Sequence, residues 1–134
     1  MMASYLLDTH TLLWWWVCPS SLSANARAQI ANKDNQIFIS LINLWELGIK
    51  YQKGKLPIAQ KAVEWFEILA KEDGFVILST KLIHARTASS YQQAHSDPFD
   101  RMLVAQAECE RLILSRPYQT LLTKQKTILV QCKL

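Results

Sequence analysis

The chain has 134 residues, half of them hydrophobic, which suits one domain with a buried core and excludes a disordered or low-complexity chain. Its longest apolar stretches, residues 12–17 and 37–49, are shorter than the roughly 20 residues that span a bilayer, and no secretory signal precedes them. Net charge is +4, and the residues after Glu110 include basic but no acidic side chains. This asymmetry either favours a polyanion such as RNA or marks a solvated basic tail. We expect one domain over residues 1–134, in the cytoplasm and without membrane contact.

Short apolar segments alternate with segments of helical spacing. We expect strands at residues 4–7, 36–40, 75–78 and 111–115, and a fifth at 127–130. We expect a helix that includes residues 12–16 behind a Thr9 cap, and helices at 24–32 behind a Ser23 cap and at 41–52, 58–71, 81–93 and 98–110. The alternation predicts an α/β fold in which helices cover both faces of a central parallel sheet of four to five strands.

Three consecutive tryptophans, Trp14 to Trp16, cannot all face one side of a helix. Either at least one of them is exposed or lies in an interface, or all three find contacts in the core or in loops.

Asp8 directly follows the first strand, and ligand sites of parallel sheets gather at the carboxyl ends of the strands. The alternative role is a helix cap, but Thr9 is available for that. Glu46 stands among apolar residues of the 41–52 segment, where an isolated carboxylate is costly unless paired, protonated or bound to metal. Its alternative role is an i,i+4 pair with Lys50.

Asp97 and Asp100 begin the segment at 98–110 and share a helical face. Asp97 before Pro98 is typical of a helix cap, and Asp100 in the first turn is favoured by the helix dipole. The structural explanation is good for Asp97 and less complete for Asp100. Arg101 can pair locally or hold a phosphate.

One shared metal site explains these four acids together. Magnesium and manganese prefer oxygen ligands and keep several waters, so a few carboxylates from different elements suffice. Such an ion activates a water and neutralises charge on a phosphodiester. The histidines are too dispersed for a zinc site, and of them only His95 is expected near the chemistry.

Three stretches of the sequence carry a resemblance to a known family. They are Tyr5-Leu-Leu-Asp-Thr-His-Thr-Leu-Leu-Trp14, Ser40-Leu-Ile-Asn-Leu-Trp-Glu-Leu-Gly-Ile-Lys50, and His95-Ser-Asp-Pro-Phe-Asp-Arg-Met-Leu-Val-Ala-Gln-Ala107. From about residue 4 to 115 the chain resembles the PIN-domain family, specifically the VapC-like toxins of bacterial type II toxin–antitoxin pairs. The His-x-Asp-Pro-Phe-Asp-Arg run is the most specific of these motifs.

The resemblance implies a three-layer α/β/α fold, metal-dependent ribonuclease activity and a cognate antitoxin that inserts into the active-site groove. Asp8, Glu46 and Asp100 match the family's metal-site acids for Mg²⁺ or Mn²⁺, and Asp97 lies beside them as a fourth catalytic candidate. Family members commonly form homodimers. For RNA binding we expect Arg101, Lys50 and Arg116.

From about residue 116 the sequence departs from the family pattern, which usually carries a further Asp after the fourth strand. Two registers place either Pro117 or Gln125 at that position, and neither supplies an acid. Two hypotheses follow. One is an endoribonuclease toxin, with activity weakened by the missing ligand. The other is a degenerate domain of the same fold that only binds RNA or an antitoxin.

Overall fold

The computed structural model describes residues 2–91 and 97–115. Its sheet has the strand order β3-β2-β1-β4, and all three neighbouring pairs are parallel. The strands are β1 Ser4–Leu7, β2 Gln36–Ser40, β3 Val76–Leu78 and β4 Ile113–Ser115. The predicted central parallel sheet is therefore confirmed with four strands, while the fifth predicted at 127–130 lies outside the described residues.

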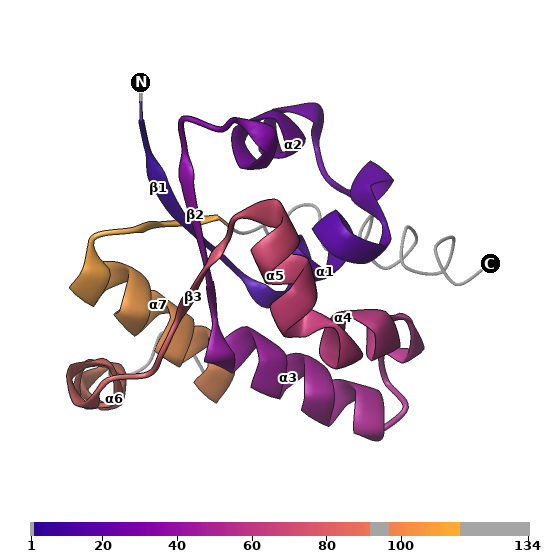
Figure 1. Ribbon diagram of the computed structural model, residues 1–134. Coiled ribbons are helices and arrows are strands. Elements are labelled where there is room, and N and C mark those ends of the chain that lie inside the picture. Colours follow the sequence, from indigo (N-terminus) through magenta and orange to yellow (C-terminus); the bar gives the residue numbers. More distant parts are fainter. Residues whose placement is uncertain (1, 92–96, 116–134) are drawn as a thin grey trace.

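Helices connect the strands and cover both faces of the sheet (Figure 1). They are α1 Thr9–Val17, α2 Ala24–Ala31, α3 Leu41–Gln52, α4 Gln60–Glu64, α5 Phe66–Asp73, α6 Leu82–Ser90 and α7 Pro98–Glu110, with short 3₁₀ turns η1 Pro19–Ser21 and η2 Pro57–Ala59. Across residues 2–91 and 97–115, none of the helices has the length and apolar character needed to cross a bilayer.

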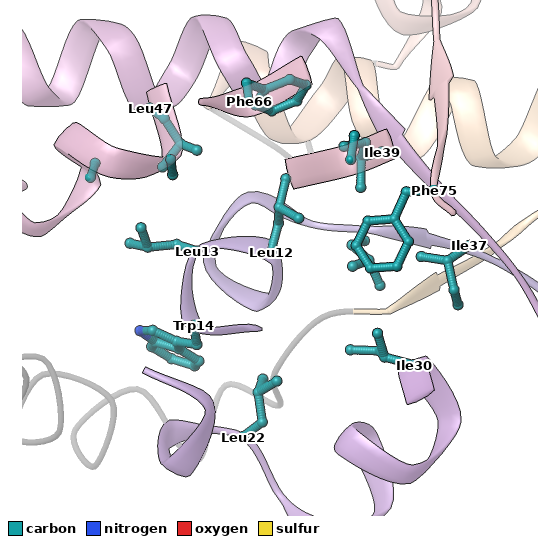
Figure 2. Packing of buried hydrophobic residues seen from close by; sticks show 14 of the residues in the cluster. Leu12, Leu13, Trp14, Leu22, Ile30, Ile37, Ile39, Leu47, Phe66 and Phe75 are labelled. Carbon is teal, nitrogen blue, oxygen red and sulfur yellow. The ribbon is translucent and has the colours of Figure 1, made fainter. Parts of the chain in front are cut away.

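Two adjacent residues of β1 divide the core, because successive side chains of a strand point to opposite faces. Leu6 packs with Leu103 of α7 on one face, whereas Leu7 packs with Leu12 and Leu13 of α1 on the other. All of these side chains are almost fully buried. Figure 2 shows the larger cluster, where α1 lies at the centre and side chains from β2, α3 and α5 surround it. The layers are therefore helix, sheet and helix, as predicted.

The tryptophan triplet finds its contacts within the fold. Trp14 is 1% exposed and belongs to the larger core. Trp15 and Trp16 are partly buried against the same core, and the indole Nε1 of each donates to Oδ2 of Asp73, at 3.0 and 2.8 Å. The second of the two alternatives is thus confirmed, and Asp73 joins α1 to the end of α5.

Replacing Asp73 with Ala is expected to lower the free energy of unfolding by about 2 kcal/mol, because two partly buried indole N–H groups lose a charged acceptor. Asn at the same position retains one neutral acceptor and should cost roughly half as much. Urea denaturation of both variants at neutral pH measures the difference. Unchanged stability of the Ala variant would show that the carboxylate does not hold the two indoles.

Four predicted boundaries shift for local reasons. The helix expected at 58–71 breaks at Trp65, whose φ of −112° and ψ of 19° depart from helical geometry. Phe75, expected in the third strand, instead donates its N–H to the end of α5. Arg111 adopts a left-handed conformation with φ 58°, which closes α7 and delays the fourth strand to residue 113.

The helix expected at 81–93 also changes its bounds. It begins at Leu82 and ends at Ser90, because Tyr91 takes an extended conformation.

A buried polar chain fixes α7 against the sheet. The Ser40 hydroxyl at the end of β2 donates to Oε1 of Gln106, which is completely buried in α7, at 2.6 Å. His84 of α6 accepts the Lys81 N–H at Nδ1, so its Nε2 carries the proton and donates to Glu110 at 2.8 Å. That bond, followed by the one from Lys81, lowers the pKa of Glu110. These contacts fix the C-terminal half of α7 against β2 and α6.

Candidate functional site

The candidate site lies at the carboxyl edge of the sheet, where β1 ends at Asp8. The Asp8 N–H donates to the carbonyl of Ser115 at 3.0 Å, so the end of β4 lies directly beside it. Asp8 is also the N-cap of α1, since its Oδ1 accepts the Thr11 N–H at 2.9 Å. The prediction that Thr9 caps this helix was wrong, because Thr9 is already the first helical residue and its hydroxyl points elsewhere.

The pKa of the Asp8 side chain is influenced by carboxylates on two other helices. The pKa of Asp8 is raised from 3.8 to about 6, chiefly because burial disfavours the charged form. The bonds with Thr11 lower the pKa, while the charges of Glu46 on α3 and Asp100 on α7 raise it. Three acids from separate segments are thus close enough to interact electrostatically around the end of β1. That placement follows from the strand order, which puts β1 between β2 and β4.

Glu46 is only 4% exposed, and both of its oxygens have partners. The Thr9 hydroxyl donates to Oε1 at 2.5 Å, and Nζ of Lys50 lies 2.6 Å from Oε2. The alternative that Glu46 forms an i,i+4 pair with Lys50 is therefore correct, although the pair lies at the edge of the core rather than on an open helix face. Thr9 and Lys50 explain how a carboxylate is tolerated there.

Sequence reasoning missed Asn43, which is completely buried under the site. Its Oδ1 accepts the Ser40 N–H at 2.7 Å, which fixes the orientation of the amide. Its Nδ2 therefore faces the Leu7 carbonyl at 3.3 Å and the Thr9 hydroxyl at 3.1 Å. Since Thr9 accepts from Asn43, its single proton is directed to Glu46. The spacing Ser40-x-x-Asn43, a capping box at the start of α3, was the available signal.

Asp97 and Asp100, at the start of α7, have different roles. Asp97 is exposed and caps the helix, accepting the Phe99 N–H at 3.0 Å, as its structural explanation predicted. Asp100 is partly buried in the first turn and is the one whose charge reaches Asp8. The charge of Asp97 instead raises the pKa of His10.

His10 is a second residue that sequence reasoning missed, although it stands two positions after Asp8. It is partly buried, and its ring centroid lies 5.8 Å from that of Trp14. Burial and, second, the charge of Lys50 lower its pKa, against the opposing influence of Glu46 and Asp97. The histidine expected near the chemistry, at position 95, lies outside the described residues.

The predicted RNA-binding cations have different surroundings. Lys50 is engaged by Glu46, and the Arg101 guanidinium donates through Nη2 to the carbonyl of Tyr91 at 3.0 Å. Nε of Arg101 is buried without a hydrogen-bond partner among the described residues. Arg116 lies outside them, as do both positions considered for the missing acid, Pro117 and Gln125. Their roles stay predictions.

The donor chemistry of the site suits a hard divalent cation, because mutually repelling carboxylate oxygens would be relieved by it. Even so, residues 2–91 and 97–115 contain no group of three or more His, Cys, Asp or Glu side chains arranged to hold a metal ion. Both oxygens of Glu46 are already used by Thr9 and Lys50.

Comparison with protein families agrees with this architecture. The family model described as PIN domain matches residues 5–116, which include every strand and helix of the described fold except the first residue of β1. A search of curated proteins finds no match.

Proposed function

Because the chain belongs to the PIN-domain family, whose members are generally nucleases and often toxins, we propose that it is a Mg²⁺- or Mn²⁺-dependent endoribonuclease. We propose further that it is the VapC-like toxin of a type II toxin–antitoxin pair, active in the cytoplasm. The observation that carries the nuclease proposal is the PIN-domain match over residues 5–116, and the proximity of Asp8, Glu46 and Asp100 at the carboxyl edge of the sheet supports it. An excess of negative charge in a partly buried place is what a divalent cation would stabilise.

In the proposed mechanism Asp8 and Asp100 would hold the ion, with Glu46 as a further ligand or as the acceptor of a proton from water. PIN-domain nucleases generally use divalent metals, and a bound ion would supply an activated water and neutralise charge on the phosphodiester. Thr9 and Asn43 keep the Glu46 carboxylate oriented. Lys50, beside Glu46, can turn to a phosphate when the site is occupied, and Arg101 and Arg116 are proposed as further phosphate contacts.

The decisive experiment is cleavage of RNA by the purified protein with and without manganese, beside an Asp8→Asn variant. We expect cleavage that requires the metal and falls to background in the variant. Cleavage without metal, or equal cleavage by the variant, would refute the proposed mechanism.

A second candidate function is a catalytically weak or inactive PIN domain that binds RNA or an antitoxin. The observation that favours it is that no Asp or Glu follows Glu110, so neither register supplies the family's further acid. Metal-dependent binding of RNA without cleavage would select this candidate. Under either function the proposed partners are RNA and an antitoxin encoded alongside, and the proposed assembly is a homodimer, which sedimentation of the free protein tests.

A further inference from the structure

Trp45, in the middle of α3, is the most exposed aromatic side chain among the described residues, at 60%. The next residue, Glu46, is only 4% exposed. The Trp45 ring lies edge-on to that of Phe99 in the first turn of α7, with centroids 5.1 Å apart and planes at 84°. The contact holds the indole in place but leaves most of it open to solvent.

The position of this aromatic pair relative to the acids is specific. Trp45 directly precedes Glu46 on α3, and Phe99 directly precedes Asp100 on α7. Phe99 packs against the smaller core, which also contains Ile42, one helical turn before Trp45. The base of the pair is therefore fixed by buried side chains, and each ring is the chain neighbour of one of the candidate acids.

We propose that the aromatic pair Trp45–Phe99 is a stacking platform for an unpaired nucleobase of the RNA, next to the phosphate that is cleaved. This inference rests on the proposed nuclease function. Aromatic side chains bind single-stranded RNA because every base offers a flat face, whereas bases within a duplex are already stacked on one another.

The size of the surface favours a base over a protein partner. Leu41, 44% exposed and one turn before Trp45, is the other exposed large apolar side chain on α3 within the described residues. Three side chains offer far less than the roughly 1,000 Å² that a stable protein interface buries. They are sufficient for one base. A cation that could contact a phosphate is also near in the chain, since Lys50 lies on the same helix, paired with Glu46.

Binding of a labelled single-stranded RNA, followed by fluorescence anisotropy, tests the proposal in an Asp8→Asn background that leaves the RNA intact. Trp45→Ala should weaken binding about tenfold, the scale of losing one stacked base. Trp45→Phe should retain most of the affinity. Trp65→Ala is the matched control, because Trp65 is 50% exposed but lies at the junction of α4 and α5, and it should bind like the parent.

Cleavage of RNAs with one abasic nucleotide, placed at each position in turn, locates the stacked base. At one position next to the cleaved bond, loss of the base should slow the otherwise wild-type enzyme but not Trp45→Ala. Unchanged RNA affinity in Trp45→Ala overturns the platform, and a simultaneous change in oligomeric state would assign Trp45 to a protein interface instead. If the Asp8→Asn parent and its Trp45→Ala variant bind RNA equally well, the stacking proposal is refuted but the proposed function is not. If the wild-type protein neither binds nor cleaves RNA, the proposed function fails and the platform with it.

Discussion

Replacing Asp8 with Asn is expected to stabilise the metal-free protein at pH 8, by about 1–3 kcal/mol, while abolishing RNA cleavage. The surroundings destabilise the charged form of Asp8, since burial and the charges of Glu46 and Asp100 raise its pKa to about 6. Asn removes the charge but keeps an oxygen for the Thr11 N–H, and Asn and Asp are equally good N-caps. The variant would therefore separate catalysis from stability, which is typical of a functional residue.

The pH dependence of this effect has a definite sign. The pKa of Asp8 is about 6 in the folded protein and close to 3.8 when unfolded, so the folded state holds the proton more tightly. The resulting stabilisation is fully present below about pH 4 and is lost as the pH rises to about 6. Urea unfolding in EDTA should show the wild type losing stability relative to Asp8→Asn across this window. Parallel curves for the two proteins would contradict the raised pKa.

Divalent metal should make the wild type more stable than Asp8→Asn, which reverses the order expected without metal. A ligand that binds only the native state stabilises it by mass action, so millimolar manganese should raise the melting temperature of the wild type. The Asp8→Asn variant should gain much less, because one of the two proposed ligands is gone. An equal gain in both proteins would indicate that the metal binds elsewhere.

Replacing Thr9 with Val is expected to lower the free energy of unfolding by about 2–3 kcal/mol and to reduce cleavage further than the lost stability explains. Val has nearly the same shape, but it removes the hydroxyl that donates to Glu46 at 2.5 Å and accepts from Asn43 at 3.1 Å. Thr9 is only 3% exposed, so water cannot readily replace that donor. The carboxylate of Glu46 then lacks one of its two partners.

Thr9→Ser is the matched control. It keeps the hydroxyl and loses one buried methyl group, at a cost of about 1 kcal/mol. Thermal and urea unfolding measure the stabilities, and cleavage rates are compared well below each melting temperature. If Ser reduces activity and Val does not, packing rather than the hydrogen bond is what Thr9 supplies to the site.

The sequence by itself determined the elements that rest on local signals. The apolar pattern of the sequence predicted β2 and α3 with their observed bounds. Asp97 followed by Pro98 predicted the start of α7. The break of a predicted helix at Trp65 was missed, because no Gly, Pro or capping residue marks it in the sequence.

Only the tertiary structure decided how the site is assembled. The strand order brings Asp8 beside the end of β4 and within electrostatic reach of Glu46 and Asp100. The link from Asn43 through Thr9 to Glu46 joins residues more than 30 positions apart, and no local pattern encodes a contact of that range. The exposure of Trp45 could not be predicted from the sequence either. In the sequence it is one more apolar residue of α3, and only the packing of α7 against that helix shows which face stays open.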